Sequence, residues 1–283
     1  AHVEYGRGMR IARALTGERS QYVEVEGNRF LPLSWDRSTT GALPSSPRRE
    51  DDAVPLGEVT LVSPTDPRSM FAVLGGFNPE GEPVPDQRPP PMLCPKVVRA
   101  VSGNHGTIIF PSFAESVVME AEMAVVIGKR VRGASPEEAL GSIWGYTCFN
   151  DVTAPQYLSL IHISEPTRQA KGIDTFASMG PWVRTDLTDD DIRNGLEIIG
   201  RVNGETVQSG NTRHYKCLPC EMVSYLSTFL TLDPGDVITL GTPPPPAAVV
   251  PGDEIEVEVE GIGVLTNHVV AALESNGESD RKG

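Results

Sequence analysis

Alternating apolar and polar residues near the start of the chain predict a small β-rich unit. The alternation runs through residues 10–14 and again through residues 21–30. Side chains with a period of two line opposite faces of a strand, so each run can bury one face. Gly27 and Asn28 interrupt the second run with residues that favour a hairpin turn. The pattern therefore predicts a small N-terminal β domain over residues 9–60.

The remainder of the chain predicts mostly strands. Continuous or alternating apolar runs predict strands over residues 107–110, 119–127, 236–240 and 254–259. Acidic residues in the first turn predict a helix start at 136–140, and apolar spacing predicts an amphipathic helix over 223–232. The predicted fold class is mainly β (α+β), with a larger domain over residues 61–274 and a polar tail over 275–283.

Charge and composition exclude several classes of partner. The chain has 38 acidic and 24 basic residues and a formal net charge of −14. An acidic surface repels phosphate backbones and anionic lipids, so we expect neither nucleic acid nor a membrane surface as a partner. No apolar run approaches the ~18 residues of a membrane span. No segment has the pattern of a signal peptide, and we expect a cytoplasmic protein.

Two acidic residues lie within an apolar run and are candidate metal ligands. Glu120 and Glu122 fall inside residues 117–127, which otherwise predict a buried strand. Their carboxylates share one face, where they raise each other's pKa unless a cation lies between them. Asp151 follows another apolar run, and three carboxylates suit Mg²⁺ or Mn²⁺ better than zinc. The alternative is that Glu120 and Glu122 form the solvent face of a half-exposed strand.

Six short motifs follow one another along the chain. They are MEAE at 119–122, GYTCFNDVTA at 145–154, KGIDTFASMGPW at 171–182, VNGETVQ at 202–208, PGDVITLGTP at 234–243 and GIGVLTN at 261–267. In this order and spacing they resemble the fumarylacetoacetate hydrolase superfamily. The resemblance implies a mixed β-roll or sandwich with a small N-terminal β domain, assembled as a homodimer. It also implies that Mg²⁺ or Mn²⁺ is bound by Glu120, Glu122 and Asp151.

The resemblance also implies side chains for catalysis and substrate binding. Lys171 would reach into the pocket, where its positive charge stabilises a developing enolate oxygen. Thr242 would contact the carboxylate of the substrate. Gln208 and Asn78 are further candidate substrate-binding residues, since both occupy positions of the family's motifs.

The segment before the first acidic motif departs from the family. Hydrolytic members carry Asn-Tyr-x-x-His-x-x-Glu here, and the His–Glu pair activates water. Residues 75–86 retain Asn78 but lack the Tyr, His and Glu at the matching positions. An acidic residue of this stretch, such as Glu82, or the downstream His105 is a candidate replacement base. The alternative is that His105 is an exposed residue of a turn.

Residues 158–168 do not resemble the family and lengthen the segment before Lys171. Their sequence, LSLIHISEPTR, matches residue for residue the translation of a transposase-type sequencing adapter. The alternative is an ordinary surface insertion. In either case we assign no function to His162 or Glu165.

These residues together predict a divalent-metal-dependent enzyme acting on a 2-oxo acid or a 1,3-dicarbonyl acid. Hydrolysis needs a positioned base for water, whereas decarboxylation, isomerisation or cleavage through an enolate needs chiefly an electrophilic metal and a proton donor. Because the His–Glu pair is missing, we expect these reactions rather than hydrolysis. The alternative is a cyclase-like tailoring or binding homologue of secondary metabolism that uses the same metal pocket.

Overall fold

The structure, a computed structural model, describes residues 9–16, 19–27, 29–34, 48–49, 54–55, 59–78, 91–160 and 166–273. The predicted polar tail over 275–283 lies outside these residues, as do Glu82, His162 and Glu165. The described chain is mainly β, as predicted.

The regular elements of the described residues are mostly short strands, with a few helices among those that follow β8. The strands are β1 (Arg10–Thr16), β2 (Arg19–Glu26), β3 (Arg29–Ser34), β4 (Arg48–Arg49), β5 (Val54–Pro55), β6 (Thr60–Val62), β7 (Met70–Leu74), β8 (Met92–Pro95), β9 (Val101–Ser102), β10 (Thr107–Phe110), β11 (Val117–Met119), β12 (Ala121–Ile127), β13 (Ile143–Asn150), β14 (Ala177–Arg184), β15 (Glu197–Val202), β16 (Glu205–Asn211), β17 (Val237–Thr239), β18 (Ala247–Val249), β19 (Glu254–Val259) and β20 (Gly263–Ala271). The α-helices are α2 (Pro136–Leu140), α3 (Pro166–Lys171), α4 (Asp189–Asn194) and α5 (Pro219–Phe229), and the 3₁₀ helices are η2 (Val98–Ala100), η3 (Pro155–Leu160) and η4 (Thr212–His214).

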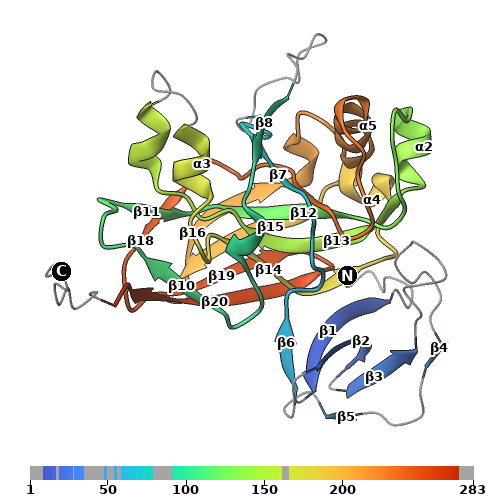
Figure 1. The fold of residues 1–283 in the computed structure, drawn as a ribbon, viewed down its shortest axis with the longest axis horizontal. Helices are drawn as coiled ribbons and strands as arrows, with labels where there is room; N and C mark the ends of the chain where they lie inside the picture. Colours follow the sequence, from blue (N-terminus) through green and yellow to red (C-terminus); the bar gives the residue numbers. More distant parts are fainter. Residues whose placement is uncertain are drawn as a thin grey trace, which may run out of the picture.

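Strand pairing forms two large sheets (Figure 1). The larger sheet runs in the order β4-β3-β2-β1-β14-β13-β12-β17-β7-β8, with β5, β6 and β9 paired to its sides, and the smaller runs β10-β20-β19-β15-β16. A separate pair joins β11 and β18. Most pairs are antiparallel, while β7 with β17, β9 with β14 and β10 with β20 are parallel. The mixed β architecture predicted from the motifs is confirmed.

The N-terminal strands form a group of their own that is joined to the large sheet. β2 and β3 pair as the predicted hairpin, with Glu26 opposite Arg29 and Gly27 at a positive φ of 56°. In Figure 1 these strands lie together below the main sheets. β1 continues into the large sheet by pairing Ile11 with Val183 of β14, and β6 also pairs with β1. Because strand pairing crosses the boundary at residue 60, the division into two domains stays a prediction.

Capping residues determine where helices α2 and α5 begin. α2 begins as predicted, and Ser135 caps it with a reciprocal bond to Glu138. The prediction of a helix over 223–232 is wrong at both ends, because α5 covers Pro219–Phe229. Proline fits the first helical position, and the Glu221 carboxylate accepts from the Leu218 N–H at 2.8 Å, so the helix begins earlier. No helix among the described residues is long and apolar enough to cross a membrane.

Strand β12 has apolar residues on both faces, and this decides where its acids point. Met123 and Val125 pack into the core between the two sheets, whereas Ala124 and Val126 join a second cluster on the opposite face of the large sheet. Period-two alternation places Glu122 on the side of Ala124 and Val126. The acidic side chain therefore leaves the inter-sheet core and projects toward the segments that cover the large sheet.

Candidate functional site

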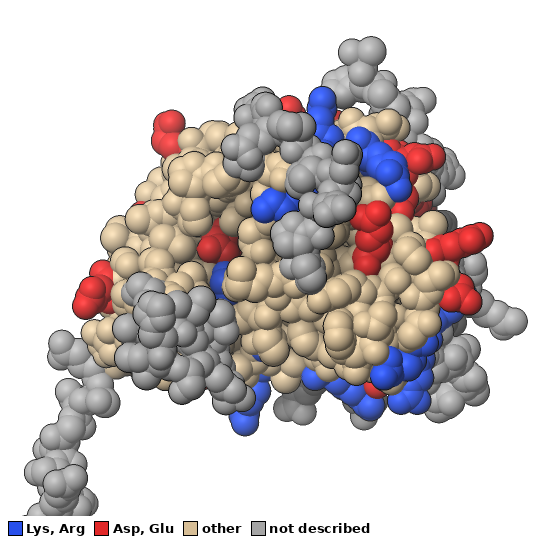
Figure 2. Space-filling view, turned by 90° about the horizontal axis from the view of Figure 1, so that it is seen from above, with Lys and Arg blue, Asp and Glu red and all other residues tan. Residues whose placement is uncertain are grey.

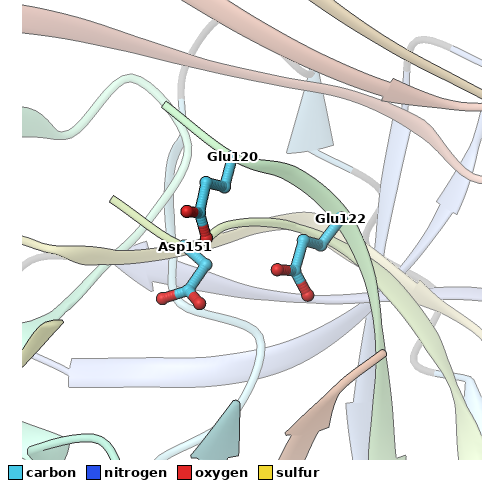
Figure 3. A group of neighbouring side chains, drawn as sticks. All are labelled: Glu120, Glu122 and Asp151. Atoms are coloured by element: carbon cyan, nitrogen blue, oxygen red, sulfur yellow. The ribbon is translucent and has the colours of Figure 1, made fainter. Parts of the chain in front are cut away.

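Three carboxylates converge at the ends of two neighbouring strands. Glu120 lies between β11 and β12, Glu122 belongs to β12, and Asp151 directly follows β13. Pairing of these strands brings the segments together, and the Asp151 N–H donates to the Glu120 carbonyl at 3.0 Å. One ligand oxygen from each side chain lies within 4.8 Å of the others (Figure 3). The expected convergence is present, while metal binding itself stays a prediction.

Burial distinguishes these carboxylates from ordinary surface acids. Glu122 is 1% exposed and Glu120 is 9% exposed, so the solvent-face alternative is wrong. Burial raises the pKa of Glu122 well above its ordinary value, and the charges of Asp151 and Glu120 raise it further. Burial also raises the pKa of Glu120, against the attraction of Lys171. In both glutamates burial favours the neutral form, and nearby positive charge favours the ionised form.

Lys171, the last residue of α3, supplies part of this positive charge. Its ammonium donates to Glu120 Oε2 at 2.7 Å, Asp151 Oδ2 at 2.6 Å and Thr153 Oγ1 at 2.7 Å. The residue is 1% exposed, and desolvation alone would lower its pKa. The attraction of Asp151 and Glu120 outweighs desolvation and raises the pKa, so the ammonium stays charged. Lys171 points at the carboxylates although residues 158–168, which include the first three residues of α3, lie just before it.

Lys96 is a second buried lysine of the cluster, which the sequence analysis missed. Its side chain is 0% exposed, and its ammonium donates to Asp151 Oδ1 and, at 2.9 Å, to the Phe176 carbonyl. The same nitrogen lies 5.8 Å from the centroid of the Phe149 ring. One signal could have indicated it, since Lys96 is the only charged residue in the run 92–98.

The two lysines determine the charge of Asp151. Burial by itself would raise the pKa of this carboxyl group. The attraction of Lys171 and Lys96 outweighs burial and lowers the pKa below its ordinary value. Asp151 is therefore ionised, with one ammonium group on each of its oxygens.

Gln208 and Thr242, expected to bind substrate, are tied to the strand that carries the glutamates. Gln208 is 2% exposed, and its Oε1 accepts from the Ala121 N–H at 2.9 Å. Its Nε2 donates to Thr242 Oγ1 at 3.0 Å and to the Pro243 carbonyl at 2.6 Å. Thr242 Oγ1 in turn donates to the Ala121 carbonyl at 3.0 Å. Both side chains fix the residue between Glu120 and Glu122, and substrate contact stays a prediction for each.

Asn78 lies on the wall of a pocket beside this site. Its N–H donates to the His214 carbonyl at 2.8 Å, and its buried Nδ2 has no hydrogen-bond partner among the described residues. The pocket has a volume of about 360 Å³, and its lining includes Phe77, Asn78, Arg213, His214 and Pro243. Pro243 is two residues beyond Gly241, whose N–H donates to Glu122 Oε2 at 2.8 Å. The segment 241–243 thus joins the wall of the pocket to Glu122, although none of the three carboxylates lines the pocket.

Two glycines join the segment of Asn78 to the segment that holds Glu122. A Cβ atom on Gly76 would lie 2.1 Å from the Leu240 carbonyl oxygen, and one on Gly241 would lie 2.8 Å from Gly76 Cα. Gly241 also has a positive φ of 100°. The close backbone approach fixes Asn78 relative to Glu122.

The two candidate bases lie elsewhere or outside the described chain. His105 is exposed in the turn at 103–106, with a φ of 58°, and its N–H donates to the Thr266 carbonyl at 2.7 Å. In the described part of the chain, no hydrogen bond or ion pair joins His105 to the three carboxylates. The exposed-turn alternative thus describes its position, and its role as a base stays a prediction, as does that of Glu82.

The three carboxylates fit a hard divalent cation. Mg²⁺ and Mn²⁺ prefer oxygen ligands, and ligands at ~2.1 Å from one ion are up to ~4.2 Å apart. The observed limit of 4.8 Å differs from this by only a few tenths of an ångström. On the face drawn in Figure 2, the acidic and basic side chains of the described residues are spread over the surface, and several groups of opposite sign adjoin each other.

Comparison with known proteins agrees with the arrangement of the site. Residues 70–270 match the family described as fumarylacetoacetate (FAA) hydrolase C-terminal. A mitochondrial oxaloacetate tautomerase of Bos taurus is 35% identical over 231 residues, which cover 77% of this chain and 71% of that protein. The similarity thus includes the whole of the candidate site.

Solved structures of similar proteins extend the likeness to the fold. The 2-hydroxyhepta-2,4-diene-1,7-dioate isomerase of Mycobacterium marinum is 29% identical, with a TM-score of 0.82 over 94% of this chain and 100% of that one. The maleylpyruvate hydrolase of Sphingobium sp. SYK-6, solved with manganese(II) and pyruvate, is 25% identical, with a TM-score of 0.73 over 93% of this chain and 100% of that one. This chain belongs to the fumarylacetoacetate hydrolase family.

Proposed function

We propose that this protein is a divalent-metal-dependent enzyme that forms and protonates the enolate of a 2-oxo acid or a 1,3-dicarbonyl acid. One observation carries the proposal: three buried carboxylates converge within 4.8 Å, and two of them, Glu120 and Asp151, contact a buried, charged lysine. Buried charges are costly unless they are paired or bind a cation, so such a cluster needs a functional reason. Tautomerisation, isomerisation and decarboxylation all pass through an enolate.

Glu120, Glu122 and Asp151 would hold Mg²⁺ or Mn²⁺. When bound, the metal supplies Lewis-acid polarisation of the carbonyl group next to the substrate's carboxylate. Support comes from the convergence of the carboxylates and from the similar maleylpyruvate hydrolase, which was solved with manganese(II) and pyruvate. Gly241 would keep Glu122 oriented through its N–H.

The remaining side chains would orient the substrate and hold its developing charge. The Lys171 ammonium lies among the carboxylates and would stabilise negative charge on the enolate oxygen. Thr242 is half-buried beside the strand of the glutamates, and its hydroxyl would turn from the Ala121 carbonyl to the substrate carboxylate. The pocket at Asn78 provides about 360 Å³ for the part of the substrate beyond the reacting carbons.

The sequence favours proton transfer or decarboxylation over hydrolysis. Residues 75–86 contain no histidine, and the exposed His105 has no contact with the carboxylates among the described residues. Water therefore lacks a positioned base of the kind that hydrolytic members use. The similar tautomerase and isomerase named above also support an enolate reaction without cleavage by water.

NMR spectroscopy in D₂O tests the proposal directly. Oxaloacetate, an acylpyruvate and a 2-hydroxy-dienedioate would each be incubated with the protein in Mg²⁺, in Mn²⁺ and in EDTA. We expect metal-dependent exchange, isomerisation or decarboxylation of at least one substrate, lost in Glu122→Gln and kept in Glu205→Gln, which alters an exposed glutamate. Failure of all three substrates in both metals would contradict the proposal.

The same assay measures hydrolysis. A missing general base typically costs about 10²- to 10⁴-fold in rate, while stabilisation of an enolate is unaffected. We therefore expect hydrolysis of acylpyruvates to be slower than the enolate reaction by a factor in this range. Hydrolysis with a kcat of about 1–10³ s⁻¹ would show that another residue, such as Glu82, acts as the base.

We also propose a homodimer, which rests on the family resemblance. Size-exclusion chromatography with light scattering measures the mass in solution against the 30.5 kDa of one chain. A monomer at micromolar concentration would contradict this part of the proposal.

A further inference from the structure

Lys96 is a fully buried lysine that has no role in the proposed reaction. Its ammonium contacts Asp151 Oδ1 and the Phe176 carbonyl and lies over the Phe149 ring. Burial lowers its pKa against the attraction of Asp151, so the fold bears a cost to keep a lysine here. A residue that only filled space at this position could be apolar.

The two lysines hold Asp151 from different sides. Lys171 contacts Asp151 Oδ2 and also reaches Glu120 and Thr153, so it lies among the carboxylates. Lys96 contacts Asp151 Oδ1 and no other carboxylate among the described residues. It therefore acts on the site through Asp151 and through its charge, behind the carboxylate rather than beside the substrate.

Counting charges shows what this second ammonium changes. Three carboxylates and Lys171 carry two net negative charges, which a divalent cation cancels. The enolate of a 2-oxo acid then brings two more negative charges, one on its carboxylate and one on its enolate oxygen. Net charge in a buried site is unfavourable, and an additional ammonium group removes one of the two.

We propose that Lys96 is a positioning residue that acts through its contact with Asp151 and supplies the positive charge with which the centre accepts a dianion. The inference rests on the metal centre of the proposed function. It assigns a selective role: Lys96 favours the enolate and chemically similar dianions over monoanions, without favouring the metal.

The direction in which metal affinity changes when Lys96 is removed distinguishes this role from a structural one. A positive charge behind Asp151 repels a divalent cation and attracts an anion. Its removal should therefore leave metal affinity unchanged or higher and should weaken dianion binding. Loss of a structural residue would disturb Asp151 and weaken both.

Calorimetric titration of Mn²⁺ and then of oxalate tests the inference without measuring turnover. Oxalate is a dianion with two oxygens placed like those of the enolate of pyruvate, and oxamate is a monoanion of nearly the same shape. The variants are Lys96→Met, which keeps the length of the side chain, Lys96→Gln, which keeps hydrogen-bond donors, and Lys96→Arg, which keeps the charge. Lys129→Met, at an exposed lysine, is the matched control.

In Lys96→Met and Lys96→Gln we expect the Kd for Mn²⁺ to stay within about threefold of the wild type or to tighten. The Kd for oxalate should rise by about tenfold or more, because unit charges within one buried site interact much more strongly than charges in water. The Kd for oxamate should rise less. Lys96→Arg should recover part of the oxalate affinity, and Lys129→Met should match the wild type.

Several outcomes would overturn the inference. Oxalate affinity that is unchanged, or that falls together with Mn²⁺ affinity, would leave Lys96 without a selective role. If neither uncharged variant folds, as judged by circular dichroism and melting, Lys96 is a structural residue and the inference fails. Absence of Mn²⁺ binding by the wild-type protein would instead refute the proposed function, so the two failures are distinct.

Discussion

Two segments of this protein carry glutamates at alternate positions, but one set is buried and the other is accessible to solvent. The first pair, Glu120 and Glu122, is buried at the start of β12. The second group, Glu254, Glu256 and Glu258, lies along β19 with alternating buried and accessible positions. Their local sequence patterns look alike, yet only the first set converges into a candidate site.

The difference lies in the residues between and after the acids. In β19 the apolar residues occupy only the other face, so the acids stay in water, where Arg201 pairs with Glu258 at 2.7 Å. In β12 apolar residues follow on both faces, so both faces are covered and the acids are buried with them. Alternation shows only that acids share a face. Burial is indicated by the apolar residues that flank the acids in both registers.

Substituting one glutamate in each strand should give the largest difference in metal binding and in turnover. Glu122→Gln removes a proposed ligand, and we expect loss of Mn²⁺ binding and a fall in kcat of at least about 10³-fold, since a Lewis-acid metal supplies several kcal/mol. Glu256→Gln should leave both unchanged. Calorimetry with Mn²⁺ and the NMR assay measure the two effects. Equal behaviour of the variants would remove the distinction between the strands.

Removing the buried ammonium group of Lys171 should give the next largest effect on turnover. We expect Lys171→Met to lower kcat by about 10²- to 10³-fold with a smaller change in KM, because the enolate charge exists mainly after bond breaking. Lys129→Met provides the exposed control. Steady-state kinetics on the substrate identified by NMR measures the split. Turnover that is unchanged would exclude Lys171 from the mechanism.

The pH dependence of the free energy of unfolding should show a smaller effect of the buried Glu122. The pKa of Glu122 is raised in the folded state, so the folded protein binds more protons than the unfolded one between the unfolded pKa near 4.5 and the folded pKa. In EDTA, wild-type stability should therefore fall, relative to Glu122→Gln, as pH rises through this window, by about 1.4 kcal/mol for each pH unit between the two pKa values. Melting temperatures from pH 5 to 8 measure the difference. Parallel curves for the two proteins would contradict the raised pKa.

The ion pair between Arg201 of β15 and Glu258 of β19 should show the smallest effect. Arg201 and Glu258 are partly exposed, with 23% and 38% of their side chains accessible. Surface ion pairs contribute about 0–1 kcal/mol, so Glu258→Gln should lower the free energy of unfolding by less than about 1 kcal/mol, and less still at high salt. Urea unfolding measures it. A loss above about 2 kcal/mol would show that these acids are not simply solvated.

The carboxylates could be predicted from sequence because their signals are local. Glu120 and Glu122 are two residues apart in one apolar run, and Asp151 ends the next strand of the same sheet. Lys96 could not be placed in the same way. Its burial depends on Asp151 and on the Phe176 carbonyl, which lie 55 and 80 residues further along the chain. Only the paired sheet brings them together.

The start of a helix and the role of a single side chain were harder to predict from sequence, because both depend on hydrogen-bond partners. The helix α5 was predicted from its apolar spacing, but its start is set by Pro219 and by the bond from Leu218 to Glu221. Gln208 was predicted to bind substrate, yet its amide is engaged by Ala121, Thr242 and Pro243. A motif fixes which residue is present, whereas its partners come from segments distant in sequence.

The contact between Gly76 and Gly241 limits which residues of this protein can be redesigned. Because a single methyl group at Gly76 would collide with the Leu240 backbone, no other amino acid fits there without moving the strand end that holds Glu122. A library built to introduce a water-activating histidine therefore has to vary other positions. The glycine pair has to be copied unchanged into every library member.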